Sequence, residues 1–195
     1  AAELYEEAKK KDRALKVYLR YVKFFPKPIE LAVETRYKIA GMYKDRGQQA
    51  SYHRQLRKIV DIDARAGDAR TDRIHYLAAQ SALVLAEPLY DAYLEVKLVK
   101  PFKRNLEKKQ ARMKKATSAY SDLVDYQVGD VTAAATFYLA EIYYSFSRAL
   151  MESERPEGLS PLEMEQYELA IEDQAYPFEE QAIDVHVTNL ELMSR

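Results

Sequence analysis

The sequence predicts an all-α protein, a right-handed α-solenoid of antiparallel helix pairs with about nine or ten helices. Two observations predict this fold. Apolar residues recur at steps of three and four through nearly the whole chain, which is the helical period, and only 5 of the 195 residues are glycine. Few glycines combined with many Ala, Leu, Glu and Lys favour long helices over sheet. No segment of useful length shows the two-residue period of a strand.

Each expected helix ends near a residue that cannot continue it. An apolar stripe from Ala14 to Phe25 stops at Pro26-Lys27-Pro28, because proline lacks the amide hydrogen and its ring clashes with the preceding turn. We expect Pro88 and Pro101 each to start or to kink a helix. Further helices are expected over about 29–46, 102–126 and 131–152. Between the first two of these, one helix should end near 64 and another should begin near 72. The last two should begin at 160 and at 177.

The helix start at Ser160 is the most sharply defined boundary. Ser160-Pro161-Leu162-Glu163 has the form of a capping box, with proline at the first helical position. In such a box the serine hydroxyl accepts a hydrogen bond from the amide three residues on, and the glutamate carboxylate accepts one from the serine amide. We therefore expect a helix to begin here.

A small residue and a tyrosine, three positions apart, recur along the expected helices. The pairs are Ala2 with Tyr5, Ala40 with Tyr43 and Ala140 with Tyr143. The small residue lets neighbouring helices approach closely, and the tyrosine fills the groove between neighbours. This pattern resembles helix A of the tetratricopeptide repeat, a unit of about 34 residues with two helices and a turn.

The resemblance implies a single helical-repeat domain over residues 1–195. Residues 1–65 would hold regular repeats, 66–127 a degenerate repeat with long helices, and 128–195 the C-terminal repeats. Because the chain opens directly on helix-forming residues, we expect it to be a fragment of a longer array.

The second half carries a more particular resemblance. It rests on Ala134 to Tyr143, on Ser147 to Met151 and on the segment 153–180. Over about 97–190 the chain resembles the long tetratricopeptide proteins of proteobacteria that accompany gliding-motility and Tol/Ton-type machinery in the cell envelope. The resemblance implies a periplasmic, partner-binding subunit of an envelope motor or transport complex, with no catalytic residue.

The residues themselves leave the compartment open. The chain has no cysteine, which suits a reducing cytosol as well as a bacterial periplasm. Its most apolar stretch, Leu77 to Ala86, is short and contains Gln80, so we expect no membrane-spanning segment.

The repeat pattern predicts a concave, partner-binding face made by the first helix of each pair. Aromatic residues flanked by charges suit peptide recognition, although most of the 16 tyrosines are also expected on core stripes. The predicted groove residues are Glu34, Tyr37 and Lys44 in one unit, and Phe137, Glu141 and Tyr144 in the best-matched unit.

Charge is segregated along the chain. Residues 96–115 hold nine Lys or Arg against one acid, whereas 152–195 hold twelve acids. A basic strip of Arg104, Lys108, Arg112 and Lys115 falls on one face of the helix after Pro101. It could dock an acidic partner or an anionic surface, or it could be a solvated face that pairs with the acidic half. Because no aromatics are interleaved with these cations, nucleic acid is not an expected partner.

No constellation of residues indicates chemistry. The three histidines, His53, His75 and His186, fall on separate expected helices without metal-ligand spacing. The segment 61–67 fits a helix end and turn better than a calcium loop, because Arg65 occupies a ligand position. We therefore expect no metal, no cofactor and no enzyme. The sequence favours a protein-interaction scaffold, with a structural subunit whose basic strip binds an anionic polymer or membrane surface as the alternative.

Overall fold

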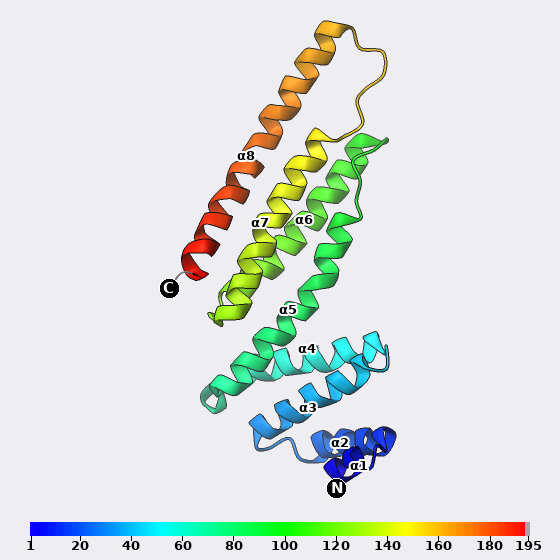
Figure 1. The fold of residues 1–195 in the computed structure, drawn as a ribbon, viewed down its shortest axis with the longest axis vertical. Coiled ribbons are helices and arrows are strands. Elements are labelled where there is room, and N and C mark those ends of the chain that lie inside the picture. Colours follow the sequence, from blue (N-terminus) through cyan, green and yellow to red (C-terminus); the bar gives the residue numbers. More distant parts are fainter. Residues whose placement is uncertain (194–195) are drawn as a thin grey trace. The chain divides into compact units, whose positions relative to one another are not determined.

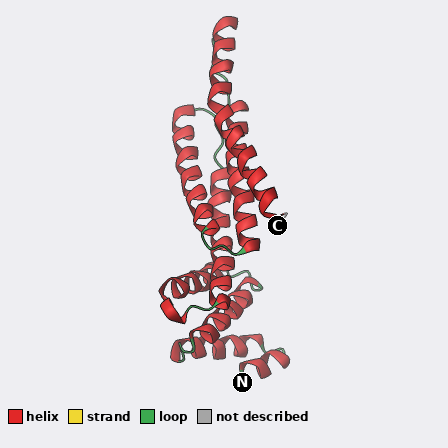
Figure 2. Cartoon of the chain, turned by 90° about the vertical axis from the view of Figure 1, so that its left-hand side faces the viewer, coloured by secondary structure: helices red, strands yellow, loops and turns green. Residues whose placement is uncertain are grey.

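The computed structural model describes residues 1–193, and within them the chain is helical with no strand (Figure 2). These residues form eight α-helices, fewer than the nine or ten expected, and one short 3-10 helix at Gly67–Ala69. The all-α prediction is confirmed. The helices are α1 (Ala2–Glu7), α2 (Lys11–Phe24), α3 (Ile29–Lys44), α4 (Gln49–Arg65), α5 (Asp72–Leu94), α6 (Phe102–Val124), α7 (Gly129–Met151) and α8 (Pro161–Met193).

Most predicted boundaries agree with the observed ones to within two residues. The capping box is confirmed in detail. The Ser160 amide donates to Glu163 Oε2 at 2.8 Å, and the Glu163 amide donates to Ser160 Oγ at 3.4 Å. These bonds satisfy amides that the first turn of α8 would otherwise leave without partners.

The helix count differs from the expected one because a proline does not always end a helix. Pro101 precedes α6 as its N-cap residue, as expected, but Pro88 lies inside α5. The expectation that a last helix begins at Pro177 is wrong, because α8 runs through it. Pro177 is exposed, whereas Ala175 and Ala182 on either side of it are buried. Packing of that inner face holds the helix together across the missing amide.

The chain divides into two compact units, 1–85 and 86–195, with the boundary inside α5. The prediction of one domain over 1–195 stays a prediction, and residues 194–195 lie outside the described part. In the first unit, helices that follow one another in sequence pack side by side (Figure 1): α1 on α2, α2 on α3, and α3 on α4. One core cluster joins the first three helices and comprises Ala2, Ala14, Leu15, Tyr18, Val22, Ile39 and Met42.

Ionic contacts add to that core. Glu6 on α1 accepts hydrogen bonds from Tyr18 at 2.7 Å and from Lys38 at 2.5 Å. Burial alone would raise the pKa of Glu6, but the bonds from Lys38 and Tyr18 outweigh it and lower that pKa. At the end of α4, Asp63 is buried and accepts a two-pronged pair of bonds from Arg70 at 2.6 and 2.7 Å. This fork closes the turn between α4 and α5.

The second unit is built around α7, which packs against both α6 and α8 (Figure 1). Ala140, the small residue expected at a close helix approach, is fully buried. The unit's largest fully buried side chains are Tyr93, Tyr120, Phe146 and Ile142. In the described part of the chain, no helix combines the length and the apolar character needed to cross a membrane.

Candidate functional site: a groove between α5 and α7

A groove with a volume of about 560 Å³ opens in the second unit. Its walls come from the C-terminal end of α5, the following segment, and the second half of α7, while α6 contributes its floor. Aromatic, aliphatic and charged side chains share the lining. The lining residues include Tyr90, Lys109, Glu141, Tyr144 and Arg148.

Lys109 forms the floor of the groove and is only 2% exposed. Its ammonium donates to the carbonyl oxygens of Val96 at 3.0 Å and of Tyr93 at 3.4 Å, and lies 4.2 Å from the centre of the Tyr93 ring. These two carbonyls lie at and just beyond the end of α5, where backbone acceptors lack helical partners. Burial lowers the pKa of Lys109.

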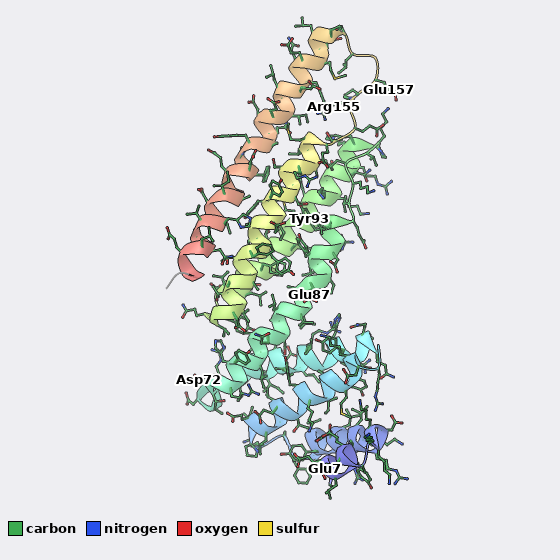
Figure 3. All side chains as sticks on the ribbon, viewed as in Figure 1. Glu7, Asp72, Glu87, Tyr93, Arg155 and Glu157 are labelled. Atoms are coloured by element: carbon green, nitrogen blue, oxygen red, sulfur yellow. The ribbon has the colours of Figure 1, made fainter. Side chains whose placement is uncertain are left out.

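A cluster of tyrosines backs the groove. The Tyr93 hydroxyl donates to the carbonyl of Ile142 on α7 at 2.8 Å, and Figure 3 shows Tyr93 between α5 and α7. Tyr90 lies 6.4 Å from Tyr120 and 5.1 Å from Tyr138, measured between ring centres. Burial, and then the nearby carboxylate of Glu141, raises the pKa of Tyr90. The cluster therefore joins α5, α6 and α7 through aromatic contacts and one hydrogen bond.

The α7 rim presents an aromatic ring between charges. Tyr144 is 44% exposed although it is a large apolar residue. The guanidinium of Arg148 lies 6.0 Å from the centre of its ring and donates to Glu152 at 2.7 Å. One turn before Tyr144, the Glu141 carboxylate lies 3.6 Å from Nε2 of His186 on α8.

The connection after α5 and the connection after α7 are joined by hydrogen bonds and an ion pair at one end of the groove. The amide of Glu154 donates to the carbonyl of Leu98 at 3.2 Å, and the Glu154 carboxylate accepts from the Lys100 amide at 2.8 Å. Lys100 also pairs with Glu157 at 2.5 Å. Arg155 donates to the Met151 carbonyl at 2.9 Å, and Figure 3 shows it with Glu157 in the connection after α7.

The structure brings two of the three predicted α7 groove residues to this groove. Glu141 and Tyr144 line it. Phe137, although 45% exposed, lies towards α8, with its ring centre 5.9 Å from that of His186.

The predicted groove residues of the first unit do not converge on one site. Glu34 accepts a hydrogen bond from Arg73 at 3.0 Å. Lys44 lies 5.8 Å from the centre of the Tyr52 ring on α4, and Tyr37 is 41% exposed. As groove residues, all three remain predictions.

The basic strip lies on the outer face of α6. Its four side chains, Arg104, Lys108, Arg112 and Lys115, are all exposed. With respect to residues 1–193, none of the four takes part in an ion pair. Met113 and Tyr120 on the opposite face are buried, as the periodicity predicts.

Sequence reasoning missed Lys109, although a signal was present. Lys109 falls outside the basic strip, at helical spacing between Leu106 and Met113 on the apolar stripe of α6. A lysine on such a stripe is expected to be buried with its ammonium at polar acceptors. The groove residues on α5 had no comparable signal, because the pairing of α5 with α7 is a tertiary contact.

The histidines do not gather into a metal site. His75 lies beside Arg70 and Asp63, and His186 lies beside Glu141. No group of three potential ligands is found among the described residues.

No protein-family model, curated protein or solved structure matches this chain.

Proposed function

We propose that this chain is a protein-interaction scaffold, a right-handed solenoid of the tetratricopeptide type, that holds a segment of a partner protein in the groove between α5 and α7. The observation that carries the proposal is the exposure of Tyr144 beside a groove of about 560 Å³. An exposed ring contributes little to folding, but at protein interfaces such anchors are worth about 2 kcal/mol or more.

The chemistry of the lining supports binding rather than catalysis. Arg148 pairs with Glu152, and the Glu141 carboxylate lies 3.6 Å from Nε2 of His186. Lys109 is held by two carbonyls and an aromatic ring. The proposed partner is a polypeptide of an envelope motor or transport complex, and the proposed compartment is the bacterial periplasm, as the sequence resemblance implies.

The experiment selects peptides from a displayed random library against the whole chain and measures their dissociation constants by fluorescence anisotropy. Tyr144→Ala should weaken binding at least tenfold while shifting the free energy of unfolding by less than about 1 kcal/mol. Phe24→Ala is the matched control, because Phe24 is exposed and lies far from the groove in sequence. Equal binding by wild type and Tyr144→Ala would refute the groove as the binding site.

A second candidate function rests on the basic strip, which would bind an anionic polymer or membrane surface. The specific observation is that its four cations are exposed and form no ion pair with any described residue. Unneutralised charges on one helix face create a positive potential over that face.

Reversing two charges separates this function from the groove. Lys108→Glu/Arg112→Glu should abolish binding to heparin and to anionic vesicles, and should leave the melting temperature unchanged because no internal ion pair is lost. Binding by the wild type should weaken steeply with salt, since counterions are released on association. Wild-type protein that binds neither probe at low salt would leave the strip without this function.

A further inference from the structure

The helix α8 has two faces of different character. Its inner face packs on α7: Ile171, Ala175 and Ala182 are buried, and the Phe178 ring centre lies 4.6 Å from that of Phe146. Asn189 on the same face accepts a hydrogen bond from Thr136 of α7 at 2.8 Å. These inner-face contacts attach α8 to the rest of the second unit.

The outer face carries a second, separate row of large apolar residues. Each is seven residues from the next, a spacing just under two helical turns, so all lie on one side of the helix about 10.5 Å apart. Their side chains are 56 to 68% exposed. We call this row the outer ladder, and it comprises Leu162, Leu169, Tyr176, Ile183 and Leu190.

The spaces between the rungs of the outer ladder are acidic. Residues 161–193 contain nine Asp or Glu and no Lys or Arg. Glu165, Glu172 and Glu179 each follow a rung by three positions, which places them on the same face of the helix. All three are exposed, and in the described chain none of them forms an ion pair.

Folding of the unit does not account for this arrangement. Five exposed apolar side chains gain little from water exclusion, and an evenly spaced row is not the scatter of single apolar residues that normal surfaces show. A spacing of seven is the repeat by which one helix packs along another. The outer ladder therefore has the geometry of a helix-docking face.

Charge decides which helix fits. A second copy of α8 would bring its own nine acidic residues against the nine of the first, and the two faces would repel each other. An anionic membrane surface would repel the same carboxylates. The basic face of α6 offers opposite charge but no apolar rungs, because Met113 and Tyr120 are buried. A complementary helix needs an apolar residue at every seventh position, with Lys or Arg three or four residues after each.

We propose that the outer face of α8 binds a basic amphipathic helix of a partner protein. The apolar residues of that helix pack between the rungs of the outer ladder, and its cations pair with the carboxylates that separate them. This surface is distinct from the groove between α5 and α7, so it does not depend on the function proposed above. Figure 1 shows α8 along one side of α7, with the start of α8 extending past the end of α7.

The probe is a synthetic peptide of four heptads with leucine at each first position, lysine at each fourth and fifth, and helix-forming residues elsewhere. Its affinity for the whole chain is measured by titration calorimetry, together with a scrambled peptide of the same composition. The designed peptide should bind at least tenfold more tightly than the scrambled one, since only the designed one presents both apolar and basic rows. Equal affinity of the two peptides would show charge attraction alone and overturn the proposal.

Variants of the protein test each half of the surface. Leu169→Ser/Ile183→Ser should reduce affinity at least tenfold, whereas Leu31→Ser, at an exposed apolar site on α3, should not. The Glu172→Lys/Glu179→Lys variant should no longer bind the lysine peptide. It should instead bind a peptide in which glutamate replaces each lysine. Both double variants should keep the wild-type melting temperature because the changed residues are exposed.

Two outcomes would assign the face to another occupant and overturn the proposal. One is a wild-type dimer, seen by analytical ultracentrifugation, that Leu169→Ser/Ile183→Ser converts to monomer. The other is binding of the wild type to anionic vesicles that this double variant loses. Tyr144→Ala should leave affinity for the lysine peptide unchanged. The groove proposal and the outer-ladder proposal can therefore be refuted independently of each other.

Discussion

Two buried tyrosines of the second unit should respond in opposite ways to the same substitution. The rings of Tyr93 and Tyr120 are both fully buried. The Tyr93 hydroxyl donates to the Ile142 carbonyl at 2.8 Å, whereas the Tyr120 hydroxyl has no hydrogen-bond partner among the described residues. Replacing either residue with phenylalanine removes one oxygen atom and leaves the ring in place.

The magnitudes follow from this difference. Tyr93→Phe should lower the free energy of unfolding by about 0.5–1.5 kcal/mol, the net contribution of one hydrogen bond. Tyr120→Phe should raise it by about 1 kcal/mol, because a buried hydroxyl without a partner carries a desolvation cost of about 1–3 kcal/mol. The estimate lies at the lower end because the lost oxygen also removes some dispersion contacts. The two variants should thus differ by about 2 kcal/mol, or roughly 4–8 °C in melting temperature.

The assay is urea unfolding of wild type and both variants, followed by far-ultraviolet circular dichroism and by tyrosine fluorescence. Coincident transitions from the two probes are required before free energies are compared. Equal destabilisation by the two substitutions would refute the reasoning, because packing of the oxygen atom, rather than its hydrogen bonding, would then set the cost.

Three further predictions test the packing, the cap and the ionisation of the same fold. Ala140→Leu should destabilise by about 1–3 kcal/mol through overpacking at a fully buried helix contact; an unchanged urea midpoint would contradict the close approach expected there. Ser160→Ala should cost about 0.5–2 kcal/mol by removing the cap of α8, and hydrogen exchange should show faster opening of residues 161–164 alone. Burial raises the pKa of Tyr93 and of Tyr120, so their contribution to stability is present below pH of about 10. It should fall as pH rises above that value, because the unfolded tyrosines lose protons first; in Tyr93→Phe/Tyr120→Phe the alkaline loss of stability should be smaller.

The helical period and the capping residues were sufficient to predict most of the secondary structure. The start of α8 was predictable because Ser160 and Glu163 act on each other locally. The helix break expected at Pro177 was wrong because contacts with α7 outweigh the loss of one amide. A local signal predicts a boundary reliably only where no tertiary packing opposes it.

The candidate site was predictable in part. Exposure of Tyr144 fits its position on α7, where it shares one side of the helix with Phe137 and Glu141 and lies opposite the buried Ile142. The floor and far wall of the groove depend on how α5 and α6 meet α7, and spacing along one helix carries no information about that meeting. Lys109 is the exception, because a lysine on an apolar stripe indicates burial before any partner is known.

The bonds that join the two connections, from Leu98 and Lys100 to Glu154 and Glu157, bear on the kinetics and thermodynamics of the binding that we propose for the groove. A loop that orders only when a ligand arrives subtracts its lost conformational entropy from the affinity. Here one end of the groove is already fixed by contacts within the chain, so a segment that enters meets a preformed surface. For the proposed partner segment we therefore expect association to be limited by diffusion and orientation instead of loop closure, with differences in affinity between sequences appearing mainly as differences in residence time.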